Sequence, residues 1–193
     1  LVSCFAALSA LRDTKTENTI SVVALFDHEE VGSVSESGAE SGLTEKLLHA
    51  FGRAAGLEGE NFAQALARSI FLSADMAHGV HPNFPDKHDT ENRPRLGDGV
   101  TLKVNQNRRY ATSAATQAVF HDICQTNQIA SQIYTHRNDL PCGSTIGPAV
   151  SAALGIPTLD VGVAMLGMHS IRETCAWADL VEYQNFMAAF LAR

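Results

Sequence analysis

The sequence lacks the features that would tie it to a membrane or to nucleic acid. Its apolar runs are far shorter than the about 20 residues that span a bilayer, and we expect no signal peptide before the first predicted strand. Basic residues are outnumbered by acidic ones, 14 to 21, which gives a formal net charge of −7. Phosphate backbones and anionic lipid surfaces repel a chain of this charge. We therefore expect neither nucleic acid nor a membrane among its partners.

Cysteine is also scarce, and its spacing excludes two common uses of this residue. The four cysteines contain no Cys-x-x-Cys pair. This pattern is not that of a disulfide framework or a thiolate zinc site, so we interpret them as reduced thiols of a cytoplasmic protein. They are Cys4, Cys124, Cys142 and Cys175.

The start of the sequence lacks both a methionine and a helix cap. Residues 1–11 already have helical periodicity at Leu1, with no capping residue before it. A helical pattern that is already running at the first residue predicts that this chain is a piece of a longer protein.

The 193 residues are enough for one domain with a sizeable core. Short apolar runs alternate with amphipathic stretches, which predicts an α/β sheet with helices on both faces. The predicted strands are 20–26, 69–75, 100–104, 132–136 and 158–162. The predicted helices are 1–11, 43–55, 62–68, 113–127, one ending at 154 and one from 176 to the end. A long irregular loop, 77–99, separates the second and third strands.

Two adjacent carboxylates, Glu29 and Glu30, follow the predicted strand 20–26. Neighbouring side chains of a strand point to opposite sides, so one glutamate can bind a metal while the other accepts a proton from water. The alternative is a solvated acidic turn, which is common for such a short motif.

Two further residues offer metal-ligand chemistry. Asp75 ends the predicted strand 69–75, where it is either a hard oxygen ligand or a local cap. His169 follows the strand 158–162, although isolated histidines are more often structural than metal-bound. Together with Glu30 they make a mixed carboxylate and imidazole set, as hydrolytic two-metal sites use.

Other polar residues admit more than one interpretation. Lys103 lies inside the strand 100–104 and either faces solvent or enters a pocket that binds an acidic substrate group. The histidines of the long loop, His78, His81 and His88, lack the spacing of a zinc protease helix and are interpreted as residues that order the loop. Cys142 is interpreted as a packed thiol, because no basic partner adjoins it in the sequence.

Five motifs, in order along nearly the whole chain, resemble the aspartyl aminopeptidase (M18) family of metallopeptidases. They are residues 26–33 (FDHEEVGS), 73–78 (SADMAH), 103–105 (KVN), 138–148 (NDLPCGSTIGP) and 168–173 (MHSIRE). The resemblance implies a mixed sheet flanked by helices, the zinc-peptidase (phosphorylase/hydrolase-like) fold. It also implies a dinuclear zinc site, with manganese or cobalt as alternative metals.

The resemblance assigns roles to six residues. Glu29 would be the general base, Glu30 and His169 would bind one metal, and Asp75 would bind the other. Lys103 would hold the side-chain carboxylate of an N-terminal Asp or Glu. Tyr110 would lie near the scissile carbonyl. Family members cleave peptides with free N-termini and form large shells, typically dodecamers, so we expect acidic peptide substrates and a homo-oligomer.

The family pattern also contains parts that this sequence does not have. These are a further histidine ligand near the N-terminus, an aspartate that bridges both metals, and an inserted dimerisation domain. Residues 1–193 would therefore be a single catalytic-domain fragment. Two alternative functions stay open: an aminopeptidase of the same family that prefers neutral N-terminal residues, or a non-catalytic fragment that serves as an assembly module.

Overall fold

The centre of the fold is one long strand, β5 (Thr158–Leu166), whose first eight residues are all buried. In the computed structural model, which describes residues 1–193, the main sheet has the strand order β1-β5-β3-β4. Strand β1 (Phe71–Ala74) runs parallel to β5, whereas β3 (Val100–Val104) runs antiparallel to it. Strand β4 (Ser131–Thr135) is parallel to β3. Two short strands, β2 (Ala77–His78) and β6 (Thr174–Cys175), pair with the end of β5.

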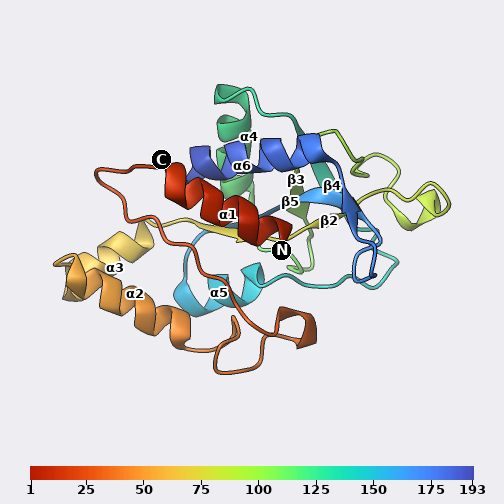
Figure 1. The fold of residues 1–193 in the computed structure, drawn as a ribbon. Coiled ribbons are helices and arrows are strands. Elements are labelled where there is room, and N and C mark those ends of the chain that lie inside the picture. The colour runs from red at the N-terminus through yellow and green to blue at the C-terminus, as the bar shows by residue number, and fades with distance from the viewer.

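Helices cover both faces of this sheet (Figure 1). One layer contains α1 (Val2–Asp13), α4 (Ala114–Thr126) and α6 (Trp177–Leu191), and α1 lies directly against α6. The other layer contains α5 (Gly147–Leu154), with α2 (Leu43–Ala54) and α3 (Gly59–Ala67) beyond it. Two 3₁₀ turns, η1 (Glu29–Val31) and η2 (Pro85–Lys87), complete the elements.

The main hydrophobic core lies between the sheet and the α1–α4–α6 layer. Phe120 of α4 and Phe186 of α6 are both fully buried, with ring centroids 5.2 Å apart. Tyr183 is also fully buried, and its hydroxyl donates a hydrogen bond to the Val161 carbonyl of β5 at 2.9 Å. Helix α4 begins with a capping box between Ser113 and Thr116, which satisfies backbone groups at its first turn. None of the helices is long and apolar enough to cross a membrane.

The predicted class, a mixed α/β sheet with helices on both faces, is confirmed. Strand β3 has the predicted bounds, and β4 begins one residue earlier than predicted. Strand β5 continues four residues past the predicted end at 162, because its later residues pair with β2 and β6, which local sequence patterns do not reveal.

The predicted buried strand 20–26 is wrong. No residue between Asp13 and η1 forms a strand, and Ile20 and Leu25 are each 54% exposed. The apolar pattern suits a strand, but no neighbouring strand pairs with it here. Instead, the hydroxyl of Ser21 donates a hydrogen bond to the Leu191 carbonyl at the end of α6. β structure needs a partner strand, which the sequence of one segment cannot supply.

Candidate active site

The two predicted glutamates lie on the single turn η1. His28 before the turn has φ 61° and Ser33 after it has φ 62°, both in the left-handed region. Non-glycine residues adopt this region only at an energetic cost, and they concentrate at functional sites. Successive residues of a 3₁₀ turn are about 120° apart, so Glu29 and Glu30 leave the turn in different directions rather than on the opposite sides of a strand. The predicted cause, the end of a strand, was wrong.

Glu30 meets His169, the other residue assigned to the same metal. His169 Nε2 lies 2.8 Å from Glu30 Oε2, and both side chains are about two-thirds exposed, at 66% and 69%. The backbone of His169 is also in the left-handed region, with φ 66°. Its N–H group donates a hydrogen bond to Glu173 Oε1 at 2.7 Å. That bond holds the loop after β5 in the conformation that presents the imidazole to η1.

Asp75 and Lys103 form a second pair beside β5. Asp75 follows β1 directly, as predicted. Lys103 Nζ donates to Asp75 Oδ2 at 2.9 Å and to the Met76 carbonyl at 3.1 Å. The Lys103 side chain is 2% exposed, whereas that of Asp75 is 46% exposed. Of the two interpretations of Lys103, the solvent-facing one is therefore wrong.

The carboxyl group of Glu29 connects these two pairs electrostatically. Burial, and then the negative charges of Asp75 and Glu30, raise the pKa of Glu29 above its ordinary 4.5, while Lys103 and His169 act in the opposite direction. All four groups are therefore close enough to Glu29 to affect its ionisation. A carboxyl group with a raised pKa among charged partners is typical of acid–base catalysts.

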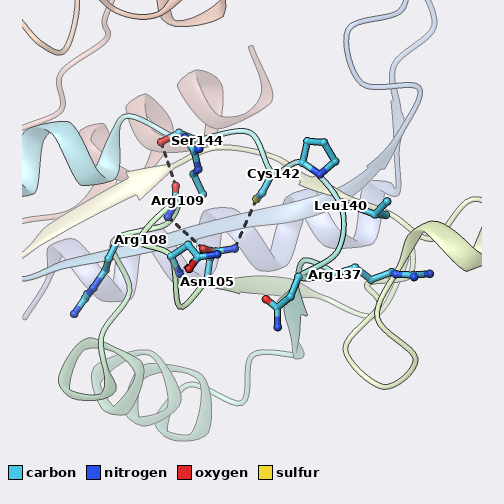
Figure 2. Close-up of a pocket in the computed structure, with 10 residues that line it drawn as sticks. Asn105, Arg108, Arg109, Arg137, Leu140, Cys142 and Ser144 are labelled. Carbon is cyan, nitrogen blue, oxygen red and sulfur yellow. Dashed lines mark hydrogen bonds between the residues drawn. The ribbon is translucent and has the colours of Figure 1, made fainter.

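Tyr110, which the resemblance places near the scissile carbonyl of the substrate, is 6% exposed and faces Lys103. The Lys103 ammonium lies 5.2 Å from the centroid of the Tyr110 ring. The Cys142 thiol lies 3.6 Å from the Tyr110 hydroxyl, and burial raises the pKa of that hydroxyl. Asn105 Nδ2 points to the same sulfur at 3.8 Å (Figure 2). Cys142 is thus part of the wall of the site rather than of the core.

Asp160, which is not among the site residues predicted from the sequence, organises this wall. Asp160 is fully buried in β5 and is the cross-strand partner of Lys103. Its Oδ2 accepts the backbone N–H of Ala111, and its Oδ1 accepts the hydroxyl of Thr145, both at 2.5 Å. One carboxylate therefore fixes the loop that carries Tyr110 and the loop that carries Cys142. A charge inside an otherwise apolar strand, the signal that identified Lys103, would have identified Asp160 as well.

The side chains of this site are of the types that bind zinc, but too few of them meet at any one point to form a zinc site. Carboxylate and imidazole are zinc ligands, and a zinc site uses three or four of them. No group of three or more His, Cys, Asp and Glu side chains converges closely enough to hold a metal ion. Glu30 and His169 form a pair, and Asp75 is paired with Lys103 instead. By themselves, the residues of this chain do not make a zinc site.

The sequence matches the family described as aminopeptidase I zinc metalloprotease (M18) over residues 1–191. The chain belongs to the M18 family. It is 46% identical to a probable M18 family aminopeptidase 2 of Mycobacterium tuberculosis over 98% of this chain and 45% of that protein. It is 43% identical to a probable M18 family aminopeptidase 2 of Pseudomonas fluorescens, over 100% of this chain and 44% of that protein.

Solved structures agree with this assignment. An M18 aminopeptidase from Thermotoga maritima superposes with a TM-score of 0.89 at 28% identity, over 99% of this chain and 44% of that one. The mApe1 dodecamer of S. cerevisiae gives a TM-score of 0.82 at 30% identity, over 98% and 43% of the two chains. The chain thus spans less than half the length of the M18 proteins that it matches.

Proposed function

We propose that this chain carries part of the catalytic site of an aminopeptidase that releases N-terminal acidic residues from peptides. The observation that carries the proposal is the cluster around Glu29. The charges of the pairs Glu30–His169 and Asp75–Lys103 all affect the pKa of this one partly buried carboxylate. Membership of a zinc metalloprotease family agrees with it. Peptide hydrolysis needs a base that accepts a proton from water, and a carboxylate with a raised pKa is suited to this task.

In this proposal each residue of the cluster has one role. Glu29 accepts a proton at a carboxylate oxygen from the attacking water and later donates it to the leaving amine. Lys103 directs its ammonium to the side-chain carboxylate of the substrate's first residue, for which its low exposure is an advantage, because a desolvated ion pair is stronger than a surface one. Tyr110 lines the position next to it, where the scissile carbonyl would lie.

Zinc is the cofactor that the family implies, and we propose that Glu30, His169 and Asp75 are this chain's contribution to its ligands. Three side chains in two separate places are too few for a dinuclear centre. We therefore also propose that residues 1–193 form a fragment of a catalytic domain and that the remaining ligands lie in further sequence. The dodecamer formed by S. cerevisiae mApe1 supports a homo-oligomer as the working form.

The test is hydrolysis of Asp-anilide and Leu-anilide by the natural protein that contains this chain, with zinc supplied. We expect faster cleavage of Asp-anilide and no cleavage of N-acetyl-Asp-anilide, since a blocked amine is no aminopeptidase substrate. Preference for Leu-anilide would favour the neutral-residue aminopeptidase. No cleavage of either free substrate would leave the assembly module as the better explanation.

A further inference from the structure

A polar cavity of about 400 Å³ lies beside Cys142 (Figure 2), whose thiol contacts the Tyr110 hydroxyl. It is bordered by the turn after β3 and by the loop between β4 and α5. Ten residues line it; none of them is acidic and three are arginines. The arginines are Arg108, Arg109 and Arg137. A cavity of this size holds a small ligand, and its lining favours a negatively charged one.

Asn105 provides the buried hydrogen-bond donor of this cavity. It is 8% exposed. Its Oδ1 accepts the backbone N–H groups of Asn107 at 2.9 Å and Arg109 at 3.4 Å, and these two donors fix the orientation of the amide. The Nδ2 group must therefore point across to Cys142, where it finds only a sulfur atom at 3.8 Å. Sulfur is a weak hydrogen-bond acceptor. The buried Nδ2 group of Asn105 can therefore still donate a hydrogen bond to a stronger acceptor.

The three arginines differ in how far their charges are compensated. Arg137 is paired with Asp139 at 2.5 Å and also donates to the Asp86 carbonyl. Arg108 makes one long hydrogen bond, 3.5 Å, to the Ala111 carbonyl. The guanidinium of Arg109 makes no hydrogen bond or ion pair. The hydrogen bonds of Arg109 involve only its backbone N–H and carbonyl groups. Arg109 is therefore the free cation of the cavity.

We propose that this cavity binds a carboxylate of the substrate peptide downstream of the cleaved bond, with Arg109 and Asn105 as the donors. The inference rests on the proposed function, because it makes the ligand part of a peptide whose first residue lies at Lys103. Tyr110 and Cys142 connect Lys103 to the cavity. The Lys103 ammonium lies 5.2 Å from the centroid of the Tyr110 ring, and the Cys142 thiol lies 3.6 Å from the Tyr110 hydroxyl. A peptide whose first side chain lies at Lys103 and which continues past Tyr110 and Cys142 would reach the cavity, because Cys142 lines it.

A peptide has two sources of such a carboxylate, its own C-terminus and an acidic side chain. The pair Asp-Ala and Asp-Ala-amide tests the C-terminus. The pair Asp-Glu-amide and Asp-Gln-amide tests a side chain at the second position. We expect at least one acid to have a KM about tenfold lower than its neutral counterpart, the effect of one charge-assisted hydrogen bond. Equal KM values within both pairs would overturn the proposal.

The variant Arg109→Gln removes the cation and keeps a polar side chain. We expect it to raise KM for the preferred acid about tenfold and to leave KM for the amide unchanged, so that the difference disappears. Arg53→Gln on α2 is the matched control, because Arg53 does not line the cavity. A difference that survives Arg109→Gln would contradict the assignment of Arg109.

A binding measurement tests the cavity without turnover. The natural protein that contains this chain, labelled with ¹⁵N, is titrated with N-acetyl-alanine and with N-acetyl-alaninamide. We expect the side-chain amide signals of Asn105 to shift with the acid alone, and this selectivity to vanish in Arg109→Gln. The absence of a selective shift would overturn the proposal even if peptides are hydrolysed. A selective shift without any peptide hydrolysis would support the cavity and contradict the proposed function.

Discussion

Replacing Lys103 by Met deletes the charge of the cluster's buried cation and keeps its apolar stem. Lys103 Nζ makes two hydrogen bonds, to Asp75 Oδ2 at 2.9 Å and to the Met76 carbonyl at 3.1 Å. Charge-assisted hydrogen bonds contribute roughly 1.5–3 kcal/mol each. Asp75 is 46% exposed and regains water when the cation is lost, so we expect the fold to lose only about 1–3 kcal/mol.

The larger effect of Lys103→Met should be on substrate selection. Losing a desolvated partner of a substrate carboxylate costs roughly 2–5 kcal/mol, or about 30-fold to 5,000-fold in kcat/KM. Lys103 is already paired with Asp75, which weakens its attraction for a substrate carboxylate. We therefore expect kcat/KM for Asp-anilide to fall by a factor near the lower end of this range. Leu-anilide has no such carboxylate, so it should lose much less, and the preference for Asp should narrow or invert.

The assay compares kcat/KM for Asp-anilide and Leu-anilide in Lys103→Met and in the control Lys46→Met. Lys46 lies exposed on α2, so its replacement should change neither value. Equal losses for both substrates in Lys103→Met would show that Lys103 does not bind the substrate side chain. The neutral-residue aminopeptidase would then be the better explanation.

Two further predictions concern the metal and the pH dependence of stability. Glu30→Gln should lower the zinc content of the natural protein, measured by atomic emission, because it removes a carboxylate donor beside His169; unchanged zinc would exclude Glu30 as a ligand. Burial and the neighbouring His136 lower the pKa of His88 below 6.5, so its unfolded form binds a proton first as the pH falls. The contribution of His88 to stability is thus present above about pH 6.5 and lost below it. Urea unfolding between pH 7.5 and 5.5 should show this loss in the unmodified chain and less of it in His88→Gln, with the exposed His49→Gln as control; identical pH slopes would contradict the assignment.

Residues with an unusual local context could be placed from the sequence. Lys103 was identifiable as a charge inside an apolar strand, and Asp75 as an acid directly after one. The structure places both at the same site, 2.9 Å apart. The pair Glu30–His169 joins residues 139 positions apart in the sequence. Their ligand chemistry grouped them with Asp75, but only the family motifs assigned these two to the same metal, and in the structure they lie 2.8 Å apart.

What the sequence could not predict depends on contacts between distant segments. Residues 20–26 have a strand pattern without a partner strand, and local pattern carries no information about pairing. Strand β3 runs antiparallel to β5, and Lys103 reaches Asp75 from within β3, a contact that depends on how the strands are ordered in the sheet. The cavity donor Asn105 depends on a turn whose hydrogen bonds orient its amide. None of these relations has a local sequence signal.

The central claim, that Glu29 is the base of a peptidase site, is tested most directly by Glu29→Gln in the natural protein. Loss of a positioned general base lowers kcat by roughly 10²–10⁴, and we expect that loss with zinc content and KM for Asp-anilide near their original values. In the unmodified protein the acidic limb of the pH–rate profile should lie above pH 4.5, because the pKa of Glu29 is raised and activity needs its ionised form. A Glu29→Gln protein that keeps its zinc and cleaves Asp-anilide at an unchanged kcat would contradict the account.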